Sequence, residues 1–195
     1  MELLFAIAVP YLMGSISFAW LAVRIMAGQD LRSEGTGNLG ARNALRVLGP
    51  VPALFVFAAD VAKGWAALWL TSLVALQKPQ LVLVAALMVV VGHCFPLWLG
   101  FKGGKGLASG AGACLYLSPW LALAVLGAGA VALTVFRNIY IAAILGIIAF
   151  VPLLYFLTDL PGRTLAGVAI AAVVLWRHKH NIEELVRPIK DRPRE

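Results

Sequence analysis

LLFAIAVPYLMGSISFAWLAV, residues 3–23, is the apolar run that decides the class of the fold. It contains no charged residue and is as long as the roughly 20 residues with which an α-helix crosses the hydrocarbon core of a bilayer. Only Met1 and Glu2 stand before it, with no basic leader and no small-residue cleavage site, so it does not have the pattern of a secretory signal peptide. We therefore predict that this run is a first transmembrane span.

The composition extends this prediction to the whole chain. Of its 195 residues 62% are hydrophobic and 13% are charged, whereas soluble domains average roughly 45–50% and about 25%. A chain with so little polar surface is predicted to be an all-α integral membrane protein, with a single domain over residues 1–195. Its candidate spans are 3–24, 52–76, 80–99, 119–136, 139–157 and 162–177.

The apolar run at residues 106–117 decides how many spans are expected. A helix of this length reaches roughly 18 Å, which is less than the core thickness of about 30 Å. If the run crosses with a thinned or protein-lined entry, the chain has about seven transmembrane helices. If it forms a re-entrant pair with the next segment, the chain has five. We favour seven.

The basic residues indicate the orientation in the membrane. The net charge is +7 with 16 lysines and arginines, of which Lys78 and Arg163 flank spans on one side and Lys63 lies within a span. All the others lie in the loop after the first span, in the 102–105 loop, at position 137 and from residue 177 onward. Because cytoplasmic loops carry an excess of Lys and Arg, the N-terminus is predicted outside and the C-terminus in the cytoplasm. This pattern belongs to membrane loops and excludes a nucleic-acid partner.

Three polar segments fall on that predicted cytoplasmic face. The first is LRSEGTGNLGARN, residues 31–43, followed by Arg46. Its glycines allow backbone N–H groups to approach an anion, and its hydroxyl and amide side chains can orient that anion. A flexible linker is the alternative, but a linker does not need two asparagines and two arginines at close spacing. The candidate binding residues here are Ser33, Thr36, Gly37, Asn38 and Arg46.

The second segment is FKGGKG, residues 101–106, which precedes an apolar run. Gly103 and Gly104 lie where a helix begins, so unpaired N–H groups and the positive end of the helix dipole favour a phosphate there. Lys105 adds a full charge. The segment is not a nucleotide-binding P-loop, because too few residues precede the lysine and Leu107 stands near where a Mg²⁺-binding hydroxyl should follow it.

The third segment is WRHKHNIEEL, residues 176–185, in which His178 and Asn181 share a helix face. Inside the second span, Asp60 and Lys63 also lie three residues apart, either as an ion pair alone or as a pair that also contacts an anionic ligand. His93 lies at the end of the third span, close in sequence to residues 101–106, which we call the lysine loop. The two cysteines lie among apolar neighbours and are predicted to be packing residues, and no metal site is expected.

Together these motifs resemble a known family. They are GTGNLGARN (35–43), DVAKG (60–64), GHCFP (92–96) with KGGKG (102–106), and RHKHNI (177–182). In this order they resemble the bacterial membrane-integral glycerol-3-phosphate acyltransferases that use acyl phosphate as donor, over essentially the whole chain. That family more often has Ser at position 36 and Thr at position 42, and Thr36 retains the hydroxyl.

The resemblance implies an enzyme of the bacterial inner membrane that works without a cofactor. It would transfer a fatty acyl group from acyl phosphate to the 1-hydroxyl of glycerol 3-phosphate, giving lysophosphatidic acid and phosphate. Its partners would be acyl phosphate, glycerol 3-phosphate and membrane lipid. The oligomeric state stays open, and a monomer satisfies the pattern.

The resemblance also suggests roles within the site. Arg46 and Lys105, with the amides of Gly103 and Gly104, would bind phosphate and stabilise charge. Ser33, Thr36 and Asn38 would orient glycerol 3-phosphate, and His178 and Asn181 would hydrogen-bond the reacting groups, with Gly37, Lys63 and His93 supporting the binding site. No His-x4-Asp pair is present, because Trp98 and Glu183 stand five residues after the two histidines. A substrate phosphate oxygen is therefore the expected proton acceptor, with His178 as its rival.

Two other functions fit the composition less well. A small transporter of anions or organophosphates would suit intramembrane charges, but the chain shows no internal repeat of broken helices, and its polar motifs gather on one face. An alcohol phosphotransferase would need clustered aspartates for a divalent metal. The nine carboxylates of the chain form no such cluster.

Overall fold

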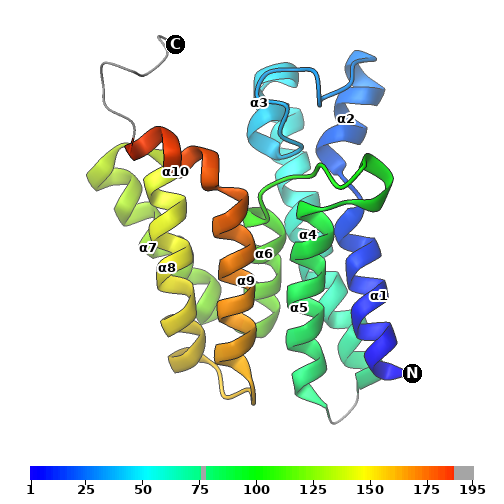
Figure 1. Ribbon diagram of the computed structural model, residues 1–195, viewed down its shortest axis with the longest axis vertical. Helices are drawn as coiled ribbons and strands as arrows, with labels where there is room; N and C mark the ends of the chain where they lie inside the picture. The colour runs from blue at the N-terminus through cyan, green and yellow to red at the C-terminus, as the bar shows by residue number, and fades with distance from the viewer. Residues whose placement is uncertain (76–77, 187–195) are drawn as a thin grey trace.

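The computed structural model describes residues 1–75 and 78–186, and this part of the chain is a helical bundle (Figure 1). The predicted all-α membrane fold is confirmed. The basic residues predicted in the tail beyond position 186 lie outside the described residues. The helices are α1 Glu2–Ser15, α2 Phe18–Ala27, α3 Ala41–Leu48, α4 Pro50–Ala75, α5 Pro79–Cys94, the 3-10 turn η1 Leu97–Leu99, α6 Leu107–Leu117, α7 Pro119–Phe136, α8 Ile139–Leu157, α9 Arg163–Arg177 and α10 Lys179–Val186.

Five segments of the described chain are long and apolar enough to cross a bilayer. They are Glu2–Ala27, Pro50–Ala75, Pro79–Leu99, Pro119–Phe136 and Ile139–Leu157. The 11-residue α6 and the 15-residue α9 reach only roughly 17 and 22 Å, yet both lie inside the bundle (Figure 1). α6 packs on α4 and α7, and α9 packs on α5 and α8. Seven crossings therefore remain a prediction, with the two short helices held by longer neighbours.

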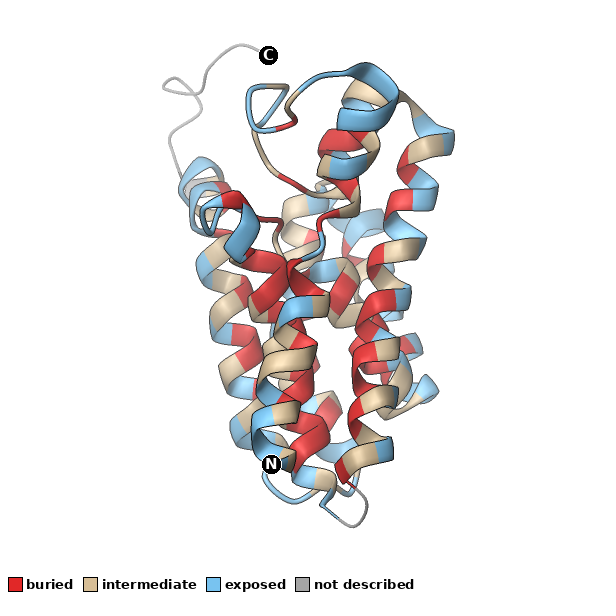
Figure 2. Ribbon diagram, turned by 90° about the vertical axis from the view of Figure 1, so that its right-hand side faces the viewer, coloured by how far each residue is buried: buried red, intermediate tan, exposed pale blue. Residues whose placement is uncertain are grey.

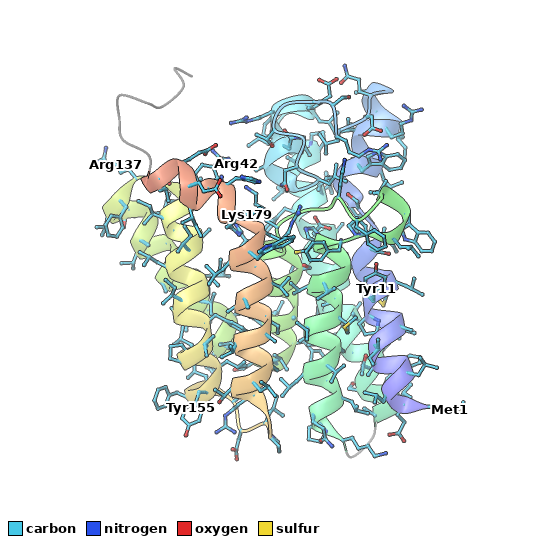
Figure 3. The ribbon with its side chains drawn as sticks, in the orientation of Figure 1. Met1, Tyr11, Arg42, Arg137, Tyr155 and Lys179 are labelled. Atoms are coloured by element: carbon cyan, nitrogen blue, oxygen red, sulfur yellow. The ribbon has the colours of Figure 1, made fainter. Side chains whose placement is uncertain are left out.

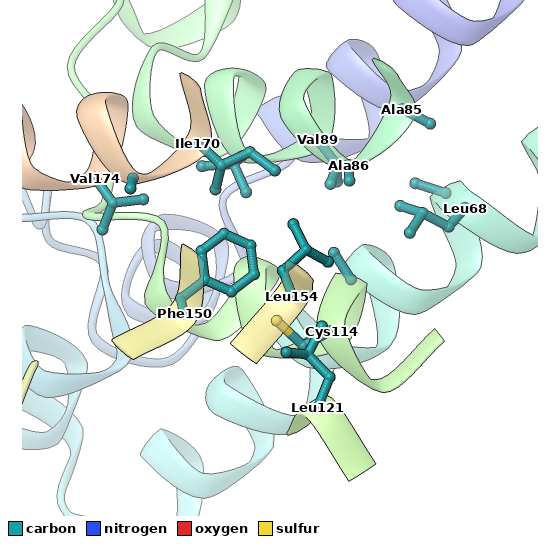
Figure 4. Packing of buried hydrophobic residues seen from close by; sticks show 14 of the residues in the cluster. Leu68, Ala85, Ala86, Val89, Cys114, Leu121, Phe150, Leu154, Ile170 and Val174 are labelled. Carbon is teal, nitrogen blue, oxygen red and sulfur yellow. The ribbon is translucent and has the colours of Figure 1, made fainter. Parts of the chain in front are cut away.

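The outer surface of the bundle is apolar, as a bilayer requires. Large side chains such as Phe55, Phe156 and Leu165 are exposed, and exposed residues follow the outward faces of the helices (Figure 2). Small and apolar residues fill the interior, where Leu68, Val89, Cys114, Phe150 and Ile170 belong to one cluster (Figure 4). Cys94 belongs to the same cluster, so both cysteines are buried packing residues.

The first predicted span is not one continuous helix. It breaks at Ile16 and Ser17, where the backbone is extended and α1 gives way to α2. Ser17 caps α2 by accepting a hydrogen bond from the N–H of Trp20 (3.3 Å), and the Lys63 ammonium donates to the Ile16 carbonyl (2.6 Å). The break is tolerated in an apolar environment because side chains satisfy the backbone groups that the helix leaves unpaired.

Glycines bring pairs of helices into backbone contact. A Cβ atom on Gly92 of α5 would lie 2.1 Å from the Tyr11 carbonyl oxygen of α1, and one on Gly112 of α6 would lie 1.9 Å from the Val61 carbonyl oxygen of α4. Small residues at such contacts are how helices associate closely in membranes. The α1–α5 contact is reinforced by the Tyr11 hydroxyl, which donates to the Phe95 carbonyl (2.9 Å).

Gly112→Ala should therefore destabilise the protein by about 1–3 kcal/mol, because α6 must move away from α4 to admit one methyl group. The matched control is Gly127→Ala in α7, where a Cβ would meet no atom within 4 Å. That change should be neutral or stabilising by up to about 1 kcal/mol through helix propensity. Thermal unfolding of the purified variants in detergent measures both effects, and equal midpoints would contradict the packing argument.

Candidate functional site

The three polar segments meet at one end of the bundle. They surround a cavity of about 630 Å³ between the loop before α3, the loop after α5, the start of α8 and the α9–α10 junction. This is the upper end in Figure 1. The cavity is lined by polar side chains from all three segments and by His93. They include Thr36, Asn38, Arg42, Arg46, His93, Lys102, Lys105, His178 and Asn181.

A buried asparagine shapes the first loop. Asn43 accepts a hydrogen bond from the Thr36 N–H (3.0 Å) and donates to the Glu34 carbonyl (2.9 Å). Gly35 has φ +55°, and a Cβ there would lie 2.3 Å from the Asn43 side-chain oxygen, so this tight turn needs glycine. The turn presents Thr36, Gly37 and Asn38 to the cavity.

Ser33 does not reach the cavity, although the sequence predicted it as a binding residue. Its hydroxyl donates to the Asp30 carbonyl (2.8 Å), and Ser33 is absent from the lining. Asp30 also accepts from Arg32 and from the Trp20 indole N–H. The Ser33 hydroxyl is therefore part of the local turn that anchors the loop to α2, and its role in binding stays a prediction.

The lysine loop is held by backbone hydrogen bonds that use the predicted amides. The N–H of Gly103 donates to the Cys94 carbonyl (3.1 Å), and that of Gly104 donates to the His93 carbonyl (3.0 Å). Arg177 donates to the Gly103 and Gly104 carbonyls (2.7 and 3.0 Å). The two amides are thus not available to a phosphate, which corrects that part of the prediction. Gly103 lines the cavity and Gly104 does not.

The N-terminus of α6 supplies alternative donors. Gly106, with φ +86°, precedes the helix, and Gly106, Leu107 and Ala108 all line the cavity. The first N–H groups of a helix have no partner within it. The predicted helix end therefore does face the cavity, but through residues that follow Lys105.

Lys105 and Asn181 meet across the cavity. The Lys105 ammonium donates to the Asn181 side-chain oxygen and lies 5.3 Å from the centre of the Tyr140 ring. Burial lowers the pKa of Lys105, and the nearby cations Arg42 and Arg177 lower it further, while Glu184 opposes them. The ammonium is thus a cation with few counter-charges, as an anion site requires.

His178 is buried at the end of α9, and its ring orientation is fixed. Its Nδ1 atom lies 2.7 Å from the Val174 carbonyl oxygen. Because a carbonyl can only accept, Nδ1 carries the proton and Nε2 of the neutral ring is an acceptor. Burial lowers the pKa of His178, as do Lys105 and Arg177, which favours this neutral form.

Lys63 lies beneath the cavity and does not line it. Its ammonium is 2.7 Å from Asp60 Oδ1 in a buried ion pair, and His93 Nδ1 is 3.6 Å from the same oxygen. Asp60 and His93 do line the cavity. A Cβ on Gly104 would lie 2.1 Å from His93 Nε2, so the imidazole packs directly under the lysine loop. The predicted ion pair is present, and a further contact of Lys63 with an anionic ligand stays a prediction.

Several lining residues were not predicted as site residues: Arg42, Lys102, Tyr140, Arg177, His180 and Glu184. Arg42 lies within the motif of residues 35–43 and Arg177 begins the motif of residues 177–182, so their positions in the sequence were a usable signal. Tyr140 was hidden in an apolar run that was interpreted only as a span. The lining is strongly basic, because the carboxylates among the described lining residues are Asp60 and Glu184.

An apolar cavity of about 330 Å³ adjoins the polar one. It lies among α5, α6, α7, α8 and α9, and Phe57, Gly106, Leu107, Ile139 and Ala143 line both cavities. Leu126 and Leu133 of α7 line it and are exposed on the outside of the bundle. The cavity therefore has an edge on the surface that a bilayer would cover.

Comparisons with known proteins give one consistent result. The sequence model of the family described as glycerol-3-phosphate acyltransferase matches residues 4–188. A protein named glycerol-3-phosphate acyltransferase from Synechococcus elongatus is 40% identical over 185 residues, covering 91% of this chain and 88% of the relative. One of the same name from Coxiella burnetii is 37% identical over 195 residues, covering 98% of each.

Two solved structures are similar along nearly the whole chain. Both are crystal structures of PlsY (YgiH), an integral membrane glycerol 3-phosphate acyltransferase, and both cover 95% of this chain and 92% of theirs. The glycerol 3-phosphate form has a TM-score of 0.85 with 30% identity. The lysophosphatidic acid form has a TM-score of 0.81 with 28% identity.

The Asp60–Lys63 pair predicts a specific stability pattern. Lys63→Met should cost about 3–5 kcal/mol, because Asp60 becomes an uncompensated buried charge. The double variant Asp60→Asn with Lys63→Met should lose less than the sum of the two single variants, since no isolated charge remains. Unfolding of all four proteins in detergent completes the cycle, and additive losses would show that the two groups do not interact.

Proposed function

The chain belongs to the glycerol-3-phosphate acyltransferase family of integral membrane enzymes, and we propose that its acyl donor is acyl phosphate. The reaction would form lysophosphatidic acid from the 1-hydroxyl of glycerol 3-phosphate and release inorganic phosphate. Membership of an enzyme family replaces the transporter considered from the sequence. The relatives named for glycerol 3-phosphate and lysophosphatidic acid support this acceptor and this product for the present chain.

The observation that carries the donor assignment is the border between the two cavities. An acyl phosphate has an anionic head and an apolar chain, and here a basic cavity joins an apolar one at Gly106, Leu107 and Ile139. A bound donor would place its phosphate among cations and its chain between helices. Its reacting carbonyl would then lie at the border, next to Lys105.

The residues suggest how the two substrates are held. Arg46 and the turn with Thr36, Gly37 and Asn38 suit glycerol 3-phosphate, because a cation stands beside small hydroxyl and amide donors. Lys105 and the first N–H groups of α6 would stabilise negative charge on the reacting carbonyl oxygen. Asn181 holds the Lys105 ammonium in place.

In the reaction, the 1-hydroxyl oxygen attacks the carbonyl carbon and the bond from that carbon to the phosphate oxygen breaks. We propose that the hydroxyl proton passes to an oxygen of the substrate phosphate. Asp60 is a poor base because taking up a proton would break its ion pair with Lys63. His178 Nε2 is an acceptor and can orient the hydroxyl, and it is the rival base.

The charge distribution supports the cytoplasmic face of a bacterial inner membrane as the location of the site. The cavity end of the bundle carries Arg42, Arg46, Lys102, Lys105 and Arg177. The opposite end carries Lys78 and Arg163, each paired with a carboxylate. By the positive-inside rule the cavity end would face the cytoplasm. Glycerol 3-phosphate would then enter from water, and the single domain of residues 1–195 would work without a cofactor.

The donor assignment predicts turnover by the purified protein given acyl phosphate and glycerol 3-phosphate, with no coenzyme A or acyl carrier protein. Lys105→Ala and Arg46→Ala should each lower kcat/KM by roughly tenfold to a hundredfold, because each variant loses a charge-assisted hydrogen bond to a substrate. Lys78→Ala, which removes an exposed cation at the far end, is the matched control and should keep full activity. Turnover with acyl-CoA but not with acyl phosphate would refute the donor.

His178→Ala distinguishes the two proton acceptors. If the substrate phosphate takes the proton, the variant loses an orienting hydrogen bond and kcat falls by about tenfold. If His178 is the base, kcat falls by roughly 10²–10⁴. Steady-state kinetics at saturating concentrations of both substrates measure the difference. Complete loss of turnover in a variant that still binds both substrates would contradict the substrate-assisted mechanism.

A further inference from the structure

Arg42 lines the polar cavity and reaches from α3 to α8. It lies in the first turn of α3, and its guanidinium carbon is 4.6 Å from the centre of the Tyr140 ring in the first turn of α8. Figure 3 shows the labelled Arg42 side chain between the α3 end and the α10 end of the bundle. Among residues 1–75 and 78–186 it forms no salt bridge. Among the described residues, the contact that faces its charge is the aromatic ring of Tyr140.

Tyr140 stands where the two cavities join. Its helix neighbours Ile139 and Ala143 line both cavities, and Tyr140 lines the polar one. The backbone at Tyr140 is fixed because Asn138 caps α8, accepting from the Tyr140 and Ile141 N–H groups (2.9 and 3.2 Å). This is the position that the head of an amphiphile would occupy if its chain lay in the apolar cavity.

Two cations share this one ring. Lys105 lies 5.3 Å and Arg42 4.6 Å from its centre, so like charges stand close together at the border of the cavities. Such a pair is unfavourable unless an anion binds near both. An arginine fork can hold two oxygens of a phosphate at once, which a lysine cannot.

Arg46 lines the same cavity but contacts a different part of its wall. It is one turn after Arg42 on α3, and a Cβ on Gly35 would lie 3.8 Å from its side chain. Arg46 thus accompanies the turn that presents Thr36 and Asn38, while Arg42 accompanies Tyr140 and Lys105. The two arginines of α3 therefore have different neighbours in the cavity wall.

We propose that Arg42 binds the phosphate of the acyl donor at the Tyr140 ring, as a donor-specific residue distinct from Arg46. This inference rests on the proposed function, which supplies an acyl phosphate as the ligand. It assigns the Tyr140 ring the role of holding the guanidinium in position when the site is empty. The phosphate would then displace no ion-pair partner of Arg42 within residues 1–75 and 78–186.

The test is a kinetic comparison in which each substrate is varied while the other is saturating. Arg42→Gln should raise the KM for acyl phosphate by roughly tenfold to a hundredfold and leave the KM for glycerol 3-phosphate within about twofold. Arg42→Lys, which keeps a point charge without the fork, should fall between Arg42→Gln and wild type.

Arg163→Gln is the matched control, because it removes an arginine that also lies over a tyrosine ring but at the start of α9, at the opposite end of the bundle. There the Arg163 guanidinium carbon lies 4.8 Å from the Tyr155 ring, far from either cavity lining. Neither KM should change. Equal increases of both KM values in Arg42→Gln would overturn the proposal and show instead a latch that closes the whole cavity.

A binding measurement separates this inference from the proposed function. Thermal stabilisation by inorganic phosphate requires no turnover, and Arg42→Gln should need a higher phosphate concentration than wild type for the same stabilisation. Unchanged phosphate stabilisation in Arg42→Gln would refute the role of Arg42. If the wild type is stabilised by phosphate through Arg42 but does not use acyl phosphate, the donor assignment fails while the anion site stands.

Discussion

The Lys63 ammonium is the group on which the arrangement of the site depends. It lies inside a membrane-spanning helix, where an unpaired charge or an unpaired carbonyl is costly. It satisfies the Ile16 carbonyl at the break between α1 and α2 and the Asp60 carboxylate at the same time. The break sets the direction of α2, and α2 leads into the loop with Thr36 and Asn38. Lys63 therefore influences the cavity without lining it.

The lysine loop is held from two sides in a similar way. His93 packs beneath Gly104 and its carbonyl accepts from the Gly104 N–H, while Arg177 of α9 donates to the carbonyls of both glycines. The loop therefore has few free backbone groups and little freedom to move. Since Arg177 precedes His178, the same contact that fixes the loop also fixes the helix end that carries His178 and Asn181. The position of Lys105 opposite Asn181 follows from this shared support.

Much of the fold could be predicted because a membrane span is recognisable as a local run of apolar residues. The spans expected at 119–136 and 139–157 coincide with α7 and α8, since Ser118 and Asn138 cap helices at the ends of apolar runs. The break at Ile16 could not be predicted, because the run stays apolar through it and the partner that satisfies it is 47 residues away. The gathering of the polar segments at one end could be predicted from the uneven distribution of charge. The hydrogen bonds of the Gly103 and Gly104 amides could not be predicted, because their acceptors are set by tertiary structure. Tyr140 carries no local signal at all.

The border between the two cavities also bears on what happens after the acyl group has moved. For an enzyme that works as proposed, inorganic phosphate is left in the basic cavity and departs into water, whereas the new lipid keeps its chain among α5, α6, α7, α8 and α9. Leu126 and Leu133 give that chain an edge on the lipid-facing surface. One product would thus leave into water and the other into the bilayer. The reverse reaction would require both to return to the border between the two cavities. The architecture acts as a partitioning device as well as a catalyst.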